Sequence, residues 1–327
     1  MPSVTDMCEQ KGIALAGTLL VDRINEIGAY PASGELTKIL GVSRAVGGCV
    51  MNTGIDIRRF DPSIPVKAIG RIGRDSDGEL LMAELKKNGI DTEGVIYGEQ
   101  ATSFTDVMSI AGGQRTFFTF PGASADFCYS DVRFDGLDAS MLHLGYFLLL
   151  DRIDAGDGKA ILREAQSRGI RTSIDLVSEN SDRYGLVAEC LEFVDNLIIN
   201  EYEAGRIAGI DPTEENLEQI ARRLKEMGVR ERVIIHMPEV GVCLSDDGFT
   251  VLPSPKLPDG FIKGKTGAGD AFCAGALIGI YRGVSDEEIL RLATKAAVAS
   301  LSSSDAVSGM VSESEIDDML SKINVKI

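Results

Sequence analysis

The segment Gly264–Gly275 holds the residues whose types and spacing could most directly do chemistry. It reads G-K-T-G-A-G-D-A-F-C-A-G, a glycine-rich turn leading into an apolar helix expected over Ala271–Tyr281. Free N–H groups and the dipole at a helix start attract an anion, and glycines let the backbone approach phosphate oxygens closely. We therefore predict an anion site at this turn, with Gly267 and Gly269 allowing the close approach.

Asp270 places a carboxylate directly beside this predicted anion site. A negative side chain would repel a phosphate, so it does not serve to bind one. It is suited to act as a general base that takes a proton from an attacking hydroxyl group. The alternative is a tight structural loop in which Asp270 only caps the helix.

Short apolar runs alternate with amphipathic segments along most of the chain. The runs predicted as buried strands are Gly12–Gly17, Val66–Ile72, Met141–Leu148, Arg171–Leu176, Asn196–Ile199 and Arg232–His236. The patterns predicted as helices are Asp77–Asn88, Gly158–Arg168, Tyr184–Phe193 and Glu214–Met227. This alternation predicts an α/β fold, in which a central, mostly parallel sheet has helices on both faces. We expect a single domain over residues 1–327.

Two segments, 19–44 and 94–120, break this alternation. The second contains strand patterns at Thr105–Ile110 and Arg115–Phe120, joined by a turn at Gly112-Gly113. Together the segments predict a small antiparallel element beside the main sheet. It is either a lid over the site or an edge hairpin without function.

Two capping-box patterns mark helices near the C-terminus. Ser285–Glu288 and Ser312–Glu315 both fit S-x-x-E, and they predict helices of about 18 and 10 residues.

Charge and composition exclude several classes of function. The 327 residues include 33 Lys and Arg against 50 Asp and Glu, a net charge of −17. Such a chain repels phosphate, so we expect neither general nucleic-acid binding nor anionic-membrane binding. The six Cys and two His lack zinc-site spacing and indicate reduced thiols in a cytoplasmic protein. We expect no signal peptide and no membrane span.

The segment Thr266–Gly275, T-G-A-G-D-A-F-x-x-G, resembles the C-terminal signature of the ribokinase (pfkB-type) carbohydrate kinases. Other family motifs follow in the family's order. They are the first strand with its Asp at Gly17–Asp22, G-G-x-x-x-N at Gly47–Asn52, G-x-x-G-x-D-x-x-G at Gly70–Gly78, and N-x-x-E at Asn200–Glu203. The resemblance extends over nearly the whole chain. It implies a ribokinase-like fold with a small β lid.

The resemblance implies a phosphoryl-transfer machinery. Asp270 is the catalytic base, and Gly267–Gly269 hold the transferred phosphoryl group. Asn200 and Glu203 act on Mg²⁺ and phosphate, often through water, which suits the reluctance of magnesium to lose its waters. The alternative for these two residues is a helix N-cap and a solvated helix face.

The resemblance also implies an acceptor site. Asp22 and Asn52 bond sugar hydroxyls, and Gly47 and Gly48 let the backbone approach the sugar. Arg115 on the lid could reach the substrate. The alternatives are a strand-end turn at Asp22, a simple turn at the two glycines, and a solvated surface arginine.

The sequence departs from the family pattern at the signature and after the strand Arg232–His236. Gly264 stands where the family usually has an Asp that helps hold an activating monovalent cation, and Lys265 follows it. We therefore expect activity that is independent of K⁺. Farther upstream, His236 and Pro238 replace the Thr and first Gly of a T-x-G-x-x-G segment that lines the nucleotide.

These replacements put the phosphoryl donor in question. The residues expected at the nucleotide are His236, Gly241 and Thr266, with Asn200, Glu203, Gly267 and Gly269 at its phosphates. His236 either contacts the nucleotide or is a hydrogen-bonded structural residue.

The resemblance implies an ATP-dependent kinase that acts on a primary hydroxyl of ribose, fructose, 2-keto-3-deoxygluconate or a similar sugar. One alternative is a nucleoside kinase, since the Phe residues of the lid could stack on a base. They are Phe104, Phe117, Phe118 and Phe120, and they could equally pack the lid's own core. The other alternative is a non-catalytic sugar- or nucleotide-binding protein on the same fold. Apolar residues on an exposed lid would allow two subunits to pair as a homodimer.

Overall fold

A large sheet organises the computed structural model, which describes residues 11–110, 115–179 and 181–327. Within these residues the sheet has nine strands in the order β13-β12-β11-β10-β9-β8-β1-β4-β5. Their bounds are β1 Gly12–Ala16, β4 Val66–Ile72, β5 Asp91–Tyr97, β8 Ala139–Phe147, β9 Arg171–Leu176, β10 Asn196–Asn200, β11 Arg232–His236, β12 Val240–Ser245 and β13 Gly248–Pro253. The strands from β11 through β5 pair in parallel, whereas β12 and β13 are antiparallel.

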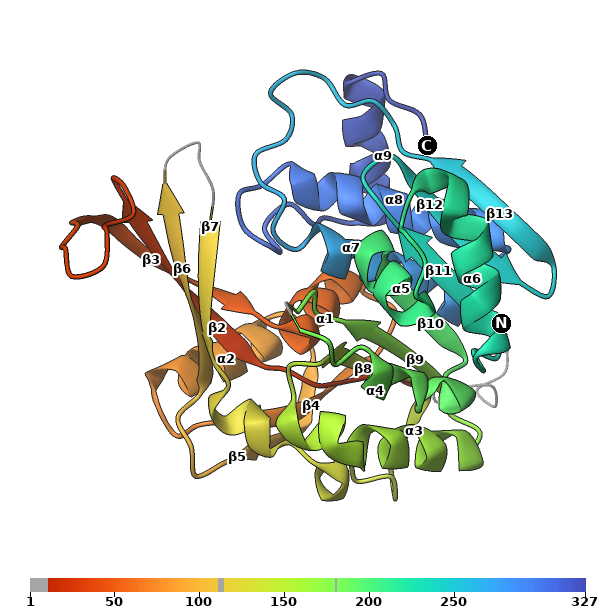
Figure 1. Ribbon diagram of the computed structural model, residues 1–327, viewed down its shortest axis with the longest axis horizontal. Helices are drawn as coiled ribbons and strands as arrows, with labels where there is room; N and C mark the ends of the chain where they lie inside the picture. The colour runs from red at the N-terminus through yellow and green to blue at the C-terminus, as the bar shows by residue number, and fades with distance from the viewer. Residues whose placement is uncertain (1–10, 111–114, 180) are drawn as a thin grey trace, which may run out of the picture.

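Helices cover both faces of this sheet (Figure 1). Their bounds are α1 Cys49–Phe60, α2 Ser76–Lys87, α3 Gly158–Ser167, α4 Gly185–Ala188, α5 Glu201–Ala208, α6 Leu217–Glu226, α7 Ala268–Arg282, α8 Asp286–Leu301 and α9 Glu313–Lys322. Successive residues of a strand point to opposite faces of the sheet. In β1, Ile13 and Leu15 therefore pack in the core with α1, α7 and α8. Ala14 and Ala16 pack in the core on the other face, with α3 and α6. No helix in the described part of the chain is long and apolar enough to cross a membrane.

A second sheet projects beside the large one, at the left of Figure 1. Its order is β3-β2-β6-β7, with bounds β2 Leu20–Ile27, β3 Ile39–Gly47, β6 Ser103–Ile110 and β7 Arg115–Phe120. We call it the small sheet. The outer pairs are antiparallel, as predicted, but β2 and β6 pair in parallel because they come from separate parts of the chain.

The bounds of the small sheet differ from the predicted segments 19–44 and 94–120. Strand β3 extends to Gly47, and Gly94–Tyr97 belong to β5 at the edge of the large sheet. The predicted turn at Gly112-Gly113 lies outside the described residues. The chain passes between the two sheets four times, after β1, β3, β5 and β7.

The predicted strands and helices of the large domain are mostly confirmed. The main exception is Tyr184–Phe193, which forms only the short α4 and a 3₁₀ turn at Leu191–Phe193. Gly185 stands at the start of that helix, where its backbone freedom disfavours a longer one. Similarly, Glu214–Asn216 form a 3₁₀ turn before α6.

The two predicted caps near the C-terminus differ in completeness. Ser312 forms the full capping box with Glu315 at the start of α9. At α8 the Ser285 hydroxyl accepts from the Glu288 N–H, which is the N-cap half of the motif, and the helix has 16 residues.

The parallel strands all end at the same edge of the large sheet, and their ends carry polar side chains. Tyr146 lies near the end of β8, Asp175 near the end of β9, Asn200 ends β10 and His236 ends β11. Helix α7 begins at this edge, where ligands of open α/β sheets generally bind.

Candidate active site

Asp270 lies in the first turn of α7, and its side chain is only 8% exposed. Its Oδ2 atom accepts hydrogen bonds from Asn52 Nδ2 at 2.9 Å and from the Tyr146 hydroxyl at 3.1 Å. The N-cap position of the helix is occupied by Gly267. Asp270 therefore does not cap the helix but faces α1 and β8 across a buried junction.

This environment perturbs the acidity of Asp270. Its pKa is raised from 3.8 to about 7, chiefly because burial penalises the charged form and because the Asp175 carboxylate lies nearby. The hydrogen bonds from Asn52 and Tyr146 oppose this rise. A carboxyl group that titrates near neutral pH is matched to the task of a general base.

The backbone that precedes Asp270 has the form of an anion site. Gly267 has φ 80°, and a Cβ there would lie 2.6 Å from Ala306, so only glycine fits. A Cβ at Gly269 would fit, because its nearest neighbour, the His236 ring, would be in van der Waals contact at 3.6 Å. The Ala268 N–H donates to the Lys265 carbonyl oxygen at 3.4 Å, and the next N–H groups of α7 have no partners within the helix.

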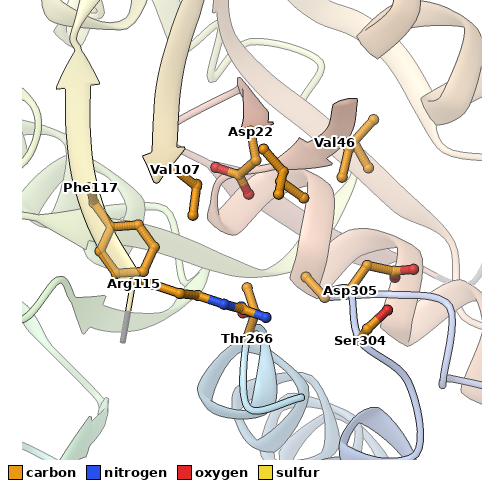
Figure 2. A pocket seen from close by; sticks show the side chains of 11 residues that line it. Asp22, Val46, Val107, Arg115, Phe117, Thr266, Ser304 and Asp305 are labelled. Atoms are coloured by element: carbon orange, nitrogen blue, oxygen red, sulfur yellow. The ribbon is translucent and has the colours of Figure 1, made fainter. Parts of the chain in front are cut away.

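A narrow cavity of about 30 Å³ separates the small sheet from the main body (Figure 2). Its polar and apolar lining residues include Asp22, Val46, Val107, Arg115 and Phe117 from the small sheet, and Thr266, Ser304 and Asp305 from the body. The Arg115 guanidinium donates a hydrogen bond to the Thr266 hydroxyl and so joins the two sides. We call this space the acceptor cavity.

Asp22 lines this cavity, whereas the two predicted glycines are not among its lining residues. Burial raises the pKa of Asp22 to about 6, although Arg115 opposes the rise. A Cβ on Gly47 would lie 2.7 Å from Asp22 Oδ2, and one on Gly48 would lie 2.5 Å from the Thr18 carbonyl oxygen. Gly47 thus leaves space for the Asp22 carboxylate, and Gly48 permits the tight entry into α1.

Two further cavities adjoin each other, and one of them reaches Asp270. One, of about 200 Å³, is polar and is lined by residues that include Asp175, Ser178, Asn200, Glu203 and Asp270. The other, of about 610 Å³, is lined largely by apolar side chains that include Met237, Pro238, Leu257, Phe272 and Val298. We call them the polar cavity and the large cavity. His236 and Gly269 line both.

Asn200 and Glu203 form a reciprocal capping box at the start of α5. Asn200 Oδ1 accepts from the Glu203 N–H at 2.9 Å, and Ser178 donates its hydroxyl to Glu203 Oε1 at 2.8 Å. The N-cap interpretation therefore holds for Asn200. Glu203, in contrast, is not solvated, since it is 3% exposed and burial raises its pKa to about 7.

The other residues predicted at the nucleotide divide between the cavities. The centroids of the His236 and Phe272 rings lie 4.7 Å apart. Burial lowers the pKa of His236 to about 4, so its imidazole is neutral. Gly241 lines the large cavity together with Lys265, whose role the sequence did not reveal. Thr266 instead lines the acceptor cavity, where it contacts Arg115.

Tyr146 and Asp175 are site residues that the sequence motifs do not include. Asp175 is a carboxylate one residue before the end of a predicted buried strand, which was the available signal. Asp175 also meets His143 and Cys273, with one potential ligand atom of each within 4.8 Å of the others. A structural zinc site generally needs four such ligands, and three gather here.

Asp270 provides a stability test of this electrostatic picture. Its folded pKa of about 7 exceeds the unfolded value of 3.8. Because the pKa is raised, the stability that the neutral form contributes is lost as the pH rises through 7. We expect Asp270→Asn to unfold with a larger free energy than wild type at pH 8, by an amount on the order of a few kcal/mol.

The difference should shrink at pH 5, where Asp270 is protonated in the folded chain. Thermal and denaturant unfolding measure it. Asp259→Asn, at an exposed carboxyl group, is the matched control and should show little change. Equal stability of the Asp270→Asn protein and wild type at pH 8 would contradict the raised pKa.

Comparisons with known proteins place the chain in a family. A family model described as "pfkB family carbohydrate kinase" matches residues 14–313. A ribokinase of Lactococcus lactis is 23% identical over 317 residues, which cover 96% of this chain and 99% of the relative. An adenosine kinase of Saccharomyces cerevisiae is 27% identical over 271 residues, covering 76% of this chain and 75% of the relative.

A solved structure shares the fold. It is an Arabidopsis thaliana ribokinase complexed with ribose and ATP, with a TM-score of 0.79 and 21% identity over 95% of this chain and 98% of that one. The resemblance inferred from the motifs is thus confirmed, and so is the ribokinase-like α/β fold. The chain belongs to the pfkB family of carbohydrate kinases and is a phosphotransferase of that family.

Proposed function

We propose that this protein transfers the γ-phosphoryl group of ATP to a primary hydroxyl group of a sugar or sugar acid. The observation that carries the proposal is the position of Asp270. This buried carboxyl group lies at the start of α7, lines the polar cavity and bonds Asn52 of α1, and Asp22 of the small sheet is near enough to raise its pKa. One carboxyl group can thus serve an acceptor on one side and a phosphoryl donor on the other.

Asp270 acts as the general base in this proposal. Its Oδ2 atom is held by Asn52 and Tyr146, so Oδ1 takes the proton from the acceptor hydroxyl as that oxygen attacks the γ-phosphorus. The N–H groups at Gly267–Gly269 bind the charge that spreads over the phosphoryl oxygens. ATP would lie along the large cavity, with its base against Pro238 and Phe272 and its phosphates toward Gly269.

The polar cavity suits a hydrated Mg²⁺ ion. It presents oxygen atoms of Asp175, Asn200 and Glu203, and magnesium prefers hard oxygen ligands. Much of the hydrogen-bonding capacity of Asn200 and Glu203 is already used by each other and by Ser178, so these two residues would act through water. The bound ion would neutralise charge on the donor's phosphates.

We propose that the small sheet is a lid. The acceptor cavity is narrow, at about 30 Å³, and the hydrogen bond from Arg115 to Thr266 spans it. In this proposal the sheet moves away from the body to admit an acceptor. The hydrogen bond from Arg115 to Thr266 would then form as the lid closes.

The lining of the acceptor cavity favours a sugar over a nucleoside. Asp22 offers a carboxylate to hydroxyl groups, and Ser304 and Asp305 add further polar atoms. Phe104 and Phe120 pack against each other with ring centroids 5.2 Å apart, so they contribute to the lid itself. Phe117 lines the cavity, and it is the observation that keeps a nucleoside kinase as the second candidate.

Turnover across a panel of acceptors tests the proposal. The panel holds ribose, fructose, 2-keto-3-deoxygluconate and nucleosides. We expect Mg-ATP-dependent ADP release with one of the sugars or sugar acids. In Asp270→Asn the loss of the base should lower kcat by about 10²- to 10⁴-fold.

Turnover on a nucleoside alone would favour the second candidate. Binding of sugar or ATP without turnover on any acceptor would contradict the proposed catalysis and indicate a different donor or a non-catalytic binding protein.

The response to monovalent cations provides a separate test. A Cβ at Gly264 would lie 2.9 Å from backbone atoms of Ser303 and Ser304, so the chain leaves no room for a carboxylate there. We expect kcat to stay unchanged when choline is replaced by K⁺. A severalfold rise in kcat on that exchange would show that other groups hold the cation.

We also propose that two copies pair through their small sheets. Leu40 and Val42 lie on the edge strand β3 and are 69% and 70% exposed. Val42→Asp should convert a dimer to a monomer in light scattering after size exclusion, because it places charge in an apolar contact. Val251→Asp, on the edge strand β13, is the control, and a wild-type monomer would refute the pairing.

A further inference from the structure

A residue outside every sequence motif contacts the proposed base. We infer that Tyr146 is a positioning residue for Asp270. Asp175 and the left-handed backbone at the end of β8 hold the Tyr146 hydroxyl against Asp270 Oδ2. The other carboxylate oxygen, Oδ1, is thereby left for the acceptor. The inference rests on the proposed function. Its contacts, however, can be tested without turnover.

The backbone at Tyr146 adopts an uncommon conformation. Tyr146 has φ 59° and Leu148 has φ 74°, in the left-handed region that bulky residues rarely occupy. Such conformations persist where the surroundings fix them, and they cluster at functional sites. The β8–β9 register also shifts at this point, between Leu144 and Phe147.

Two carboxylates fix this conformation by accepting backbone hydrogen bonds. Asp175 Oδ1 accepts from the Tyr146 N–H at 2.6 Å, and Asp154 Oδ1 accepts from the Leu148 N–H at 2.9 Å. Gly145 precedes Tyr146, and a Cβ there would lie 2.7 Å from Cys49 and 3.0 Å from Asp175 Oδ1. Close packing of β8 against α1 and β9 thus sets the direction of the Tyr146 side chain.

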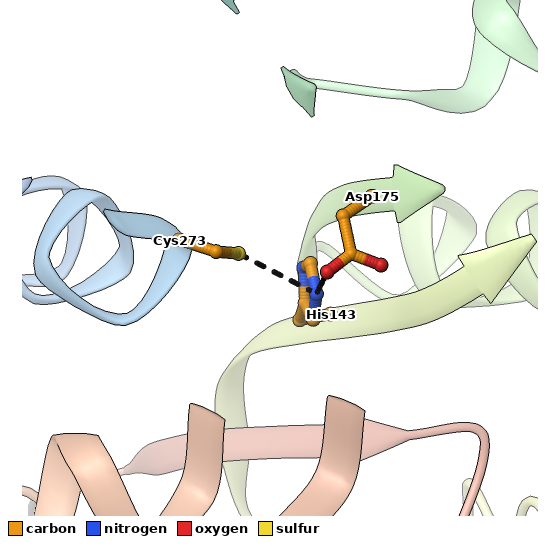
Figure 3. Close-up of side chains that lie close together, drawn as sticks. All are labelled: His143, Asp175 and Cys273. Carbon is orange, nitrogen blue, oxygen red and sulfur yellow. Dashed lines mark hydrogen bonds and ion pairs between the residues drawn. The ribbon is translucent and has the colours of Figure 1, made fainter. Parts of the chain in front are cut away.

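Asp175 is itself held at its other oxygen (Figure 3). His143 Nε2 lies 3.5 Å from Asp175 Oδ2, and His143 Nδ1 lies 3.0 Å from the Ser173 hydroxyl. Cys273, three residues after Asp270 on α7, places its Sγ 3.7 Å from His143 Nε2. This buried cluster therefore ties β8, β9 and the first turns of α7 together around the Tyr146–Asp270 contact.

The Tyr146 hydroxyl is the donor in its hydrogen bond with the ionised Asp270. Burial and the Asp270 charge raise the pKa of Tyr146 well above its usual value, so the phenol stays protonated. Asp270 Oδ2 then accepts two hydrogen bonds, from Tyr146 and Asn52. Two donors on one oxygen orient the carboxylate plane and stabilise its charged form.

Removal of the hydroxyl should therefore change the titration of Asp270. The titratable groups that face Asp270 come from every element packed around it. They are Asp22 on β2, Cys49 and Asp56 on α1, Tyr146 on β8, Asp175 on β9 and Cys273 on α7. Asp22 and Asp175 raise the pKa of Asp270, while the Tyr146 hydrogen bond lowers it, so its loss shifts that pKa upward.

Tyr146→Phe tests the inference, because it removes one hydroxyl and keeps the ring. We expect kcat to fall about tenfold to a hundredfold, as the loss of a hydrogen bond to a charged group would give. Both KM values should change less than about threefold, and the acid limb of the kcat–pH profile should move to higher pH.

Tyr281→Phe is the matched control. It removes a hydroxyl from the same helix as Asp270, but from the far end, and should leave kcat and the pH profile unchanged. An unchanged kcat and acid limb in Tyr146→Phe would overturn the inference.

A second measurement does not depend on turnover. The carboxyl carbon of Asp270, labelled with ¹³C and assigned by its absence in Asp270→Asn, reports its titration by NMR. We expect a higher midpoint in Tyr146→Phe than in wild type and no shift in Tyr281→Phe. A higher midpoint in a protein that phosphorylates no acceptor would refute the proposed function alone. An unchanged midpoint would refute the contact.

Discussion

The structure depends on one constraint, which is that a carboxyl group must remain buried at the start of a helix without a counter-ion. Among residues 11–110, 115–179 and 181–327, none places a cation against Asp270, which is instead held by the neutral donors Asn52 and Tyr146. A salt bridge would lower its pKa and weaken it as a base, whereas neutral donors orient it and allow a pKa near 7. The ends of β8 and β9, the start of α1 and the turn at Gly267 are all arranged around this group.

The same constraint explains why several unfavourable features gather at one edge of the sheet. Tyr146 has a left-handed backbone, Glu203 is a buried acid, and Asp56 is a fully buried carboxyl whose pKa is raised well above its usual value. Each of them lowers the stability of the fold. The large apolar cores on both faces of the nine-stranded sheet offset this loss and keep the site rigid.

Sequence patterns were sufficient for features set by local order along the chain. The alternation of apolar runs predicted the parallel strands except β5, and G-A-G-D placed a helix start at Ala271, three residues after the observed start of α7. Contacts between distant segments were not predictable in this way. The link from Asp175 to Tyr146 spans 29 residues and depends on a backbone angle that tyrosine rarely adopts. The hydrogen bond from Arg115 on the small sheet to Thr266 joins residues 151 positions apart, and no motif indicated it.

The four chain passages between the sheets limit how the small sheet could move if it acts as the proposed lid. Residues 17–19, 48, 98–102 and 121 connect the small sheet to the body, so it is tethered at four places. A flap on a single linker could swing freely, but one with four tethers can turn only about an axis that passes near all of them. The small sheet would then open as a rigid body, and Asp22 and Arg115 would move together. The two residues would reach the acceptor in a fixed relative geometry at every closure.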